Sequence, residues 1–170
     1  MAGILSVQQI QGLATAADPT TVEISSGHTL YAPGHVIQVK SVTGSTNAST
    51  SSSSSYSDVP DSISITPTST SSKILILGSI AAESYSSGSD RGIRLRILRG
   101  SSVLQTSTYN LYMSNNTNQR ISMVTMHYLD SPATTSATTY KFQFNTTGSS
   151  ATARVNQYAD SNITLMEIAG

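Results

Sequence analysis

From Tyr31 to the C-terminus, apolar residues recur at every second position, which indicates β-strands with one buried face. Clear examples are the trio Ile93, Leu95 and Ile97 and the trio Tyr140, Phe142 and Phe144. Beyond residue 30, no helical pattern of about twelve residues interrupts this alternation. The sequence therefore predicts an all-β chain of about eight or nine strands folded as an antiparallel β-sandwich.

The buried core is expected on the alternating positions. It comprises Ile37, Val39, Ile63, Ile65, Ile74, Leu75, Ile76, Leu77, Ile93, Leu95, Ile97, Met123, Tyr140, Phe142, Phe144, Ile163 and Leu165. Two segments, Ile74–Leu77 and Met166–Ile168, are apolar on both faces, which suits a central strand or a subunit contact. Because this core is modest for 170 residues, we expect a second buried surface, supplied by a closed symmetric oligomer.

Two regions are expected along the chain: an N-terminal arm over residues 1–30 and a β-sandwich head domain over residues 31–170. Apolar residues recur every third position in the arm, and they are anchor candidates for attachment or assembly: Ile4, Val7, Ile10 and Leu13. The alternative for this arm is a frayed terminus. The hydroxyl-rich segment Thr43–Ser55 is expected to be a loop, because it carries almost nothing apolar to bury.

Composition excludes several classes of protein. The net charge is zero with nine Lys and Arg, which argues against a nucleic-acid partner. The absence of Cys removes disulfide scaffolds, thiolate zinc sites and cysteine nucleophiles. The longest unbroken apolar stretch, Ile74–Leu77, is far too short to insert in a membrane. No basic residue precedes Lys40, so we expect no signal peptide and synthesis in the host cytoplasm.

No catalytic or metal motif emerges, so we expect no enzyme, no metal and no cofactor. The chain lacks a G-x-S-x-G elbow and a phosphate-binding glycine loop. The three histidines, His28, His35 and His127, show no ligand spacing. Asp58 and Asp61 flank Pro60 and could hold calcium with loop carbonyls, although turn residues bonded to their own backbone are the simpler interpretation.

Tyrosines and asparagines gather in or beside the expected loops, among Ser and Gly. Tyr with Ser, Gly and Asn is typical of adaptable recognition surfaces, because the ring stacks and the short polar groups hydrogen-bond. The candidates for a receptor-facing surface are Tyr85, Tyr109, Tyr112, Asn115, Asn116 and Tyr158. The segment Tyr109–Arg120 is expected to be the main receptor-facing loop. The alternative is that these are packed loop tyrosines with satisfied hydroxyls.

Three charged residues are candidates for a subunit contact. Arg94 and Arg96 fall on one face of their strand, and Glu167 lies on a strand that is otherwise apolar. An unpaired buried charge costs several kcal/mol. We therefore predict that Glu167 pairs with Arg94 or Arg96, within a subunit or across a trimer contact. The alternative is an exposed arginine ladder that blunts a sheet face.

Two sets of segments carry resemblances to known families. SKILILGS (72–79), IRLRILRGSSV (93–103), Ile121–Leu129, Thr139–Phe144 and ITLMEIA (163–169) follow the strand order of the TNF-like jelly roll, which implies a homotrimeric head. SISITPTSTSSKILILGSI (62–80) and the ending ITLMEIAG (163–170) resemble bacteriophage fibre and tail-appendage proteins, notably marine ones. The second resemblance implies a trimeric virion appendage whose N-terminal part attaches to other virion proteins.

The expected function is therefore that of a phage virion structural protein exposed on the particle, with the head bound to a host surface glycan or protein. The chain lacks the extended shaft of a long fibre, which leaves room for a capsid fibre or a decoration protein. The alternatives are a capsid decoration or cementing protein without a receptor role, and a soluble TNF-like lectin.

Overall fold

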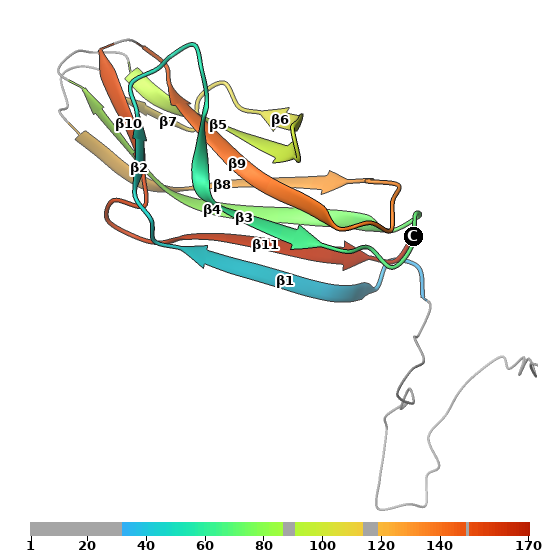
Figure 1. Cartoon of the computed structure of the whole chain (residues 1–170). Helices are drawn as coiled ribbons and strands as arrows, with labels where there is room; N and C mark the ends of the chain where they lie inside the picture. Colours follow the sequence, from blue (N-terminus) through green and yellow to red (C-terminus); the bar gives the residue numbers. More distant parts are fainter. Residues whose placement is uncertain (1–31, 87–90, 114–118, 149) are drawn as a thin grey trace, which may run out of the picture. The chain divides into compact units, whose positions relative to one another are not determined.

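The alternating segments form strands in the computed structural model, which describes residues 32–86, 91–113, 119–148 and 150–170 (Figure 1). Within these ranges the strands are β1 (Val36–Gly44), β2 (Ala48–Thr50), β3 (Ser57–Ile65), β4 (Lys73–Ser86), β5 (Arg91–Arg99), β6 (Ser102–Thr106), β7 (Leu111–Met113), β8 (Gln119–Asp130), β9 (Thr138–Thr146), β10 (Ala151–Val155) and β11 (Ser161–Ile168). The described part of the chain contains no helix that could cross a membrane. Residues Pro33–Gly170 form one contact unit.

Two antiparallel sheets pack face to face, so the predicted β-sandwich is confirmed. The six-stranded sheet has the order β1-β11-β4-β10-β2, and β8 pairs with the other side of β4. The five-stranded sheet has the order β3-β9-β5-β6, with β7 also paired to β5. Strand β4 is the longest, with 14 residues, and it pairs with β11 along its first half and with β10 along its second.

The core lies between the inner faces of the two sheets. Its largest fully buried side chains are Tyr140, Phe142, Phe144, Ile65, Ile74, Ile76, Ile80, Ile93, Leu95, Ile97 and Ile163. Ten of these eleven belong to the predicted core; Ile80 does not. The sheets approach closely at Gly78, where a Cβ atom would lie 2.2 Å from the ring of Phe142. A side chain at that position would force the sheets apart.

Five predicted core residues are wrong: Ile37, Val39, Leu75, Leu77 and Met123 are exposed or half-buried. Leu75, Leu77 and Met123 point to the outer face of the six-stranded sheet, whereas their neighbours Ile74, Ile76 and Val124 point inward. In strands with apolar residues at consecutive positions, alternation does not say which face is inside. At Ile37 and Val39, a register shift between Val36 and Gln38 changes the phase of β1.

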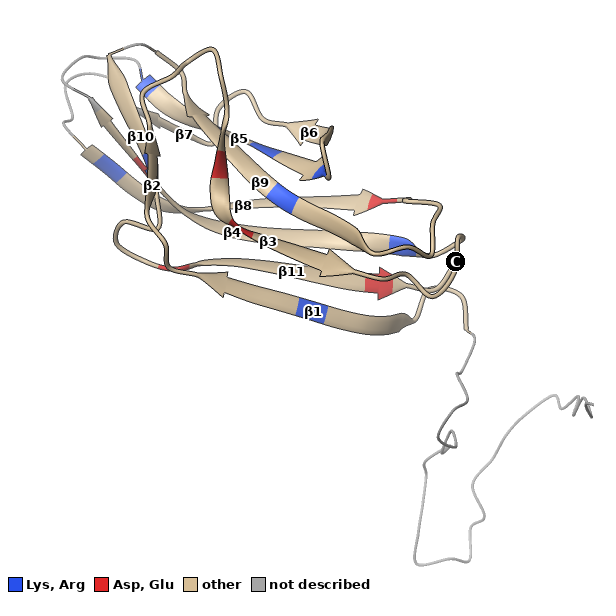
Figure 2. Cartoon of the chain, viewed as in Figure 1, with Lys and Arg blue, Asp and Glu red and all other residues tan. Residues whose placement is uncertain are grey.

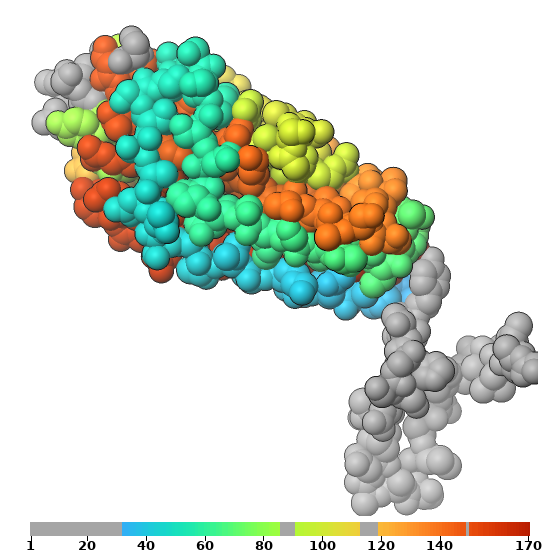
Figure 3. Space-filling model, viewed as in Figure 1, coloured from blue at the N-terminus to red at the C-terminus, as the bar shows by residue number. Residues whose placement is uncertain are grey.

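Two expected loops contain short strands. β2 interrupts the segment Thr43–Ser55. The serines after β2 form a turn, in which Ser52 Oγ accepts hydrogen bonds from the backbone nitrogen and the hydroxyl of Ser55. The carbonyl of Ser52 accepts from the Thr146 amide at 3.1 Å, which ties this turn to the end of β9. Figure 3 shows the teal residues of this segment packed beside the orange residues of β9. Likewise, β7 lies inside the segment predicted as one long loop over residues 109–120.

A polar cluster joins the two sheets at one end of the core. Tyr140 Oη, on β9, donates to Asp130 Oδ2 of β8 at 2.7 Å. The guanidinium of Arg99, on β5, bonds both oxygens of the same carboxylate at 2.9 and 3.0 Å. Burial, followed by the hydrogen bond to Asp130, raises the pKa of Tyr140. The cluster satisfies a buried carboxylate with one neutral and one charged donor.

Candidate functional site

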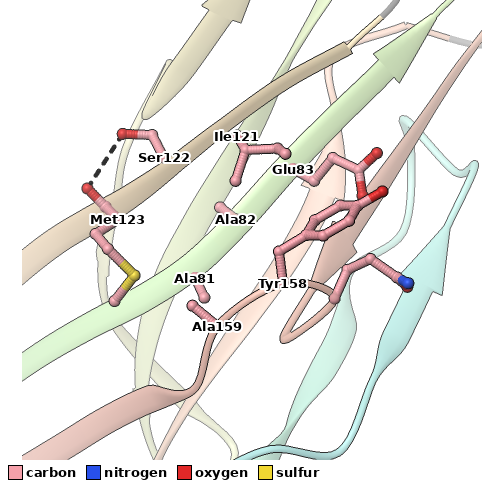
Figure 4. Close-up of a pocket in the computed structure, with 9 residues that line it drawn as sticks. Ala81, Ala82, Glu83, Ile121, Ser122, Met123, Tyr158 and Ala159 are labelled. Atoms are coloured by element: carbon pink, nitrogen blue, oxygen red, sulfur yellow. Dashed lines mark hydrogen bonds between the residues drawn. The ribbon is translucent and has the colours of Figure 1, made fainter.

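A pocket opens on the outer face of the six-stranded sheet, between β4, β8 and the turn that joins β10 to β11 (Figure 4). Its volume is about 140 Å³. It is lined by Ala81, Ala82, Glu83, Ile121, Ser122, Met123, Gln157, Tyr158 and Ala159. In the sheet register Ala81 lies opposite Met123 and Glu83 opposite Ile121. The small Ala81 side chain, set between longer ones, leaves the space that forms the pocket.

Glu83 is the one ionisable group of the pocket floor and is almost completely buried, with 1% of its surface exposed. Its Oε1 atom accepts from Gln119 Nε2 at 2.7 Å and from Arg154 Nη1 at 3.1 Å. Arg154 lies directly opposite Glu83 on β10, so the sheet register creates this ion pair. The second oxygen, Oε2, is buried and receives no hydrogen bond from the described residues. An unpaired buried acceptor is costly and calls for an explanation.

The wall of the pocket is Tyr158, whose side chain is 60% exposed. Its hydroxyl accepts from Gln119 Nε2 at 3.0 Å, so the same amide holds Tyr158 and Glu83. The turn that carries Tyr158 is fixed by Asn156, which has a positive φ of 59°. The backbone amide of Asn156 donates to the Ala81 carbonyl at 2.9 Å, and the side-chain oxygen of Asn156 accepts from the Ser161 hydroxyl. The pocket thus has a floor of sheet positions on β4 and β8 and one exposed aromatic wall from the β10–β11 turn.

The receptor-facing tyrosines predicted from sequence fall into two groups. Tyr85 joins Tyr158 near the pocket, because the Arg154 guanidinium lies 5.4 Å from the Tyr85 ring centre. Tyr109 and Tyr112 form a separate edge-to-face pair at 5.4 Å, beside β5, with Arg94 5.9 Å from the Tyr109 ring centre. Candidates Asn115 and Asn116 lie outside the described residues, as do the arm residues Ile4, Val7, Ile10 and Leu13.

Sequence reasoning missed Glu83, Arg154 and Gln119 as site residues. Arg154 stands 71 positions from Glu83 and Gln119 stands 36 positions away. A sequence-level signal did exist, since Glu83 is the one acidic residue of its strand and directly follows two alanines. That signal marks a polar group near small neighbours, but it does not identify its partners.

The pairing predicted within a subunit between Glu167 and Arg94 or Arg96 is not formed. Glu167 accepts from Gln38 Nε2 at 2.6 Å and from the amide and the hydroxyl of Thr68, both at 2.7 Å. Burial works against the charge, but the hydrogen bonds from Gln38 and Thr68 outweigh it and lower the pKa of Glu167. Glu167 is fully buried within the single chain, and its donors come from β1 and the β3–β4 loop.

Arg94 and Arg96 do share the outer face of β5, on the five-stranded sheet. The Arg96 guanidinium lies 4.0 Å from the Tyr56 ring centre, and its Nε atom donates to Gln143 Oε1 at 2.7 Å. Arg94 Nε donates to the Thr108 carbonyl at 3.2 Å. These partners are neutral groups from strand β9 and from the loops beside β3 and β6, and both arginines are half-buried. Figure 2 shows how few charged positions the ribbon carries and how they are scattered over both sheets.

Within the described ranges no group of three or more His, Asp or Glu could hold a metal ion. The calcium alternative at Asp58 and Asp61 is not supported, because Asp58 forms an ion pair with Lys141 at 3.0 Å. Asp58 also accepts from Gln143 Nε2 at 2.5 Å, and this bond is the main cause that lowers the pKa of Asp58. The carboxylate is therefore engaged by the neighbouring strand β9.

Comparison with known proteins gives a weak structural likeness. The sequence matches no protein-family model and no curated protein. The VP2 subviral particle of infectious bursal disease virus is similar at 12% identity and a TM-score of 0.41, over 88% of this chain and 42% of that one. The structure of the Gx strain of infectious bursal disease virus is similar at 11% identity and a TM-score of 0.41, over 88% of this chain and 41% of that one. This chain spans less than half of each, and these scores are too low to carry an argument about function.

Proposed function

We propose that this chain is a virion structural protein, the β-sandwich head of a short fibre or tail appendage, and that it binds the host cell surface. The observation that carries the proposal is the outward-facing pocket, which combines an exposed Tyr158 ring with an unpaired oxygen of buried Glu83. Glu83 lies on strand β4, and Tyr158 lies in the short β10–β11 turn, which the backbone amide of Asn156 ties to the Ala81 carbonyl. The resemblance of segments 62–80 and 163–170 to phage appendage proteins supports the virion setting.

In this proposal one end of the sandwich, the proximal end, attaches to the particle, and the other, the distal end, binds the host. The proximal end holds the start of β1 and the end of β11, where Gly34 and Ala169 are hydrogen-bonded at 2.8 Å. The pocket is lined by the β10–β11 turn, and this turn lies at the end of β11 opposite to the C-terminus (Figure 1). From Leu75 to Glu83 the eight steps of β4 cover about 26 Å at the usual rise per residue. Attachment to the particle near β1 would therefore leave the pocket accessible to the host.

We also propose that the proximal end forms the contact of a homotrimer. Four apolar residues lie in one row across the outer face of the six-stranded sheet, in direct register: Val39, Met166, Leu75 and Leu129. Val39 and Leu129 are about half exposed. Burial of such an exposed apolar row under a second copy is favourable, because it removes apolar surface from water. Three copies around one axis would present three pockets, and weak sites then gain avidity.

The attachment proposal is tested on particles that carry substituted copies of the chain. Ala81→Leu fills the pocket from its floor and should slow adsorption to host cells, whereas Thr125→Leu, exposed on the same face outside the pocket, should not. Added full-length chain should compete with particles for the cells. Equal adsorption by both variants, together with no competition, would show that the pocket has no role in attachment.

A second candidate is a capsid decoration protein without a receptor role. The same apolar row at the proximal end favours it, because the row could rest on a capsid lattice as well as on a second copy. Imaging of particles distinguishes the two, since a decoration protein lies on the capsid shell and an appendage head lies on the tail or on a fibre.

A further inference from the structure

Glu83, which lines the pocket, keeps one buried hydrogen-bond acceptor that the chain leaves unused. The side-chain oxygens around it are otherwise engaged: Ser122 Oγ donates to the Met123 carbonyl at 3.3 Å, and Gln157 Oε1 accepts from Asn47 at 3.4 Å. Tyr158 Oη accepts from Gln119. Among these oxygens, Glu83 Oε2 alone has no partner in the described residues. A ligand that matches the pocket therefore brings one donor.

Most of the remaining lining is apolar. Ala81, Ile121, Met123 and Ala159, with the Tyr158 ring, surround the space (Figure 4). A cavity of about 150 Å³ holds one benzene molecule, so the 140 Å³ present here suit a single six-membered ring. A sugar ring of that size would bring several hydroxyls against these apolar walls, where they would lose hydrogen bonds to water without replacement.

The charge of the site favours a neutral donor. Glu83 is already paired with Arg154, so the pocket floor carries no net charge. A lysine or arginine inserted here would be a third charge next to Arg154. A neutral hydroxyl can bond Oε2 without that repulsion.

We propose that the pocket receives the phenol ring of one tyrosine side chain from a partner polypeptide on the host surface, with the phenol hydroxyl donating to Glu83 Oε2. This inference rests on the proposed attachment function and names its partner class. Oε2 is buried, so the ring must move the exposed Tyr158 wall, which Gln119 holds through one hydrogen bond to its hydroxyl. The incoming hydroxyl replaces that bond with one to a charged acceptor.

Three small probes test this on the full chain, by saturation-transfer NMR and titration. They are p-cresol, which copies the tyrosine side chain; toluene, which lacks the donor; and methyl α-glucopyranoside. We expect p-cresol to bind about tenfold or more tightly than toluene, the range for a hydrogen bond to a charged acceptor. We expect no binding of the glucoside. Equal affinity for p-cresol and toluene, or preferential binding of the glucoside, would overturn the inference.

Variants locate the binding. Ala81→Leu should abolish p-cresol binding, while the control Thr125→Leu should leave it unchanged. In Glu83→Gln, the amide oxygen must face Arg154 and Gln119, which leaves an NH₂ group at the Oε2 position. This group can donate to the phenol oxygen only in a neutral hydrogen bond, so the affinity for p-cresol should fall several-fold, towards that of toluene. If Glu83→Gln fails to fold, the inference is still tested by Ala81→Leu and by the comparison of p-cresol with toluene and the glucoside. A pocket that takes the glucoside while Ala81→Leu particles adsorb poorly would refute the tyrosine partner and leave the attachment function standing.

Discussion

Replacement of Glu167 by Gln is the sharpest test of how this sandwich is closed at its proximal end. The Glu167 carboxylate is fully buried and collects donors from two other segments, Gln38 of β1 and Thr68 of the β3–β4 loop. In Glu167→Gln, the amide oxygen can still face the two donors of Thr68. The new NH₂ group then opposes Gln38 Nε2, donor against donor.

The size of the effect follows from those contacts. Gln38 could turn its amide around, but Gln38 Nε2 also donates to the Thr66 carbonyl at 2.8 Å, and that bond would be lost instead. A hydrogen bond to a charged group contributes about 1.5–3 kcal/mol, and the neutral amide avoids part of the burial cost of a charge, so we expect a net loss of about 2 kcal/mol. For a chain of this length that corresponds to a fall of about 4–8 °C in the unfolding midpoint.

The assay is thermal unfolding of the parent chain and Glu167→Gln between pH 7 and pH 3, with Asp160→Asn as the matched control at an exposed carboxylate. The pKa of Glu167 is lowered in the folded chain, so its contribution is complete above the unfolded pKa, about 4.3, and is lost as the pH falls through the folded pKa. The difference between parent and variant should therefore shrink in acid. Equal midpoints at pH 7, or a difference that does not change with pH, would refute the reasoning.

Two further results are expected. In alkaline titration, Tyr140 should stay protonated after the exposed tyrosines ionise, because burial and the hydrogen bond to Asp130 raise its pKa. The tyrosinate absorbance of the folded parent chain and of Tyr140→Phe should therefore rise by the same amount. A parent chain in which all 8 tyrosines ionise together would contradict this. In light scattering, the parent chain should have about three times the monomer mass of 17.9 kDa, and Leu129→Lys should give monomers. A parent chain at the monomer mass would count against the proximal contact.

Local pattern was enough to place most strands and the inner face of several. Where one face is apolar and the other polar, as in Ile93–Ile97 or Tyr140–Phe144, the pleat alone assigns the buried side. The prediction was wrong where both faces are apolar, as at Leu75 and Met123, and where a bulge shifts the phase, as at Val39. In those strands the outcome depends on which sheet covers which face.

The site was harder to predict than the fold. Tyr85 and Tyr158 were candidates because Tyr beside Ser, Gly and Asn is typical of recognition surfaces, and the structure brings both near Glu83 and Arg154. Nothing in the sequence links Glu83 to Arg154, or Glu167 to Thr68, because these pairs are 71 and 99 positions apart. The sequence-based pairing of Glu167 with Arg94 or Arg96 used charge alone and ignored which sheet each residue occupies.

By itself, the sequence determined that this chain is a sandwich of short strands with a weakly charged, hydroxyl-rich surface. Alternation and composition are properties of neighbouring residues, and the strand pleat converts them directly into buried and exposed faces. The tertiary structure alone decided that Glu83 lies between Arg154 and Gln119 with one oxygen left over, and that four apolar residues form a row on the outer face. These features depend on the register between strands distant in sequence, which the packing of both sheets fixes together.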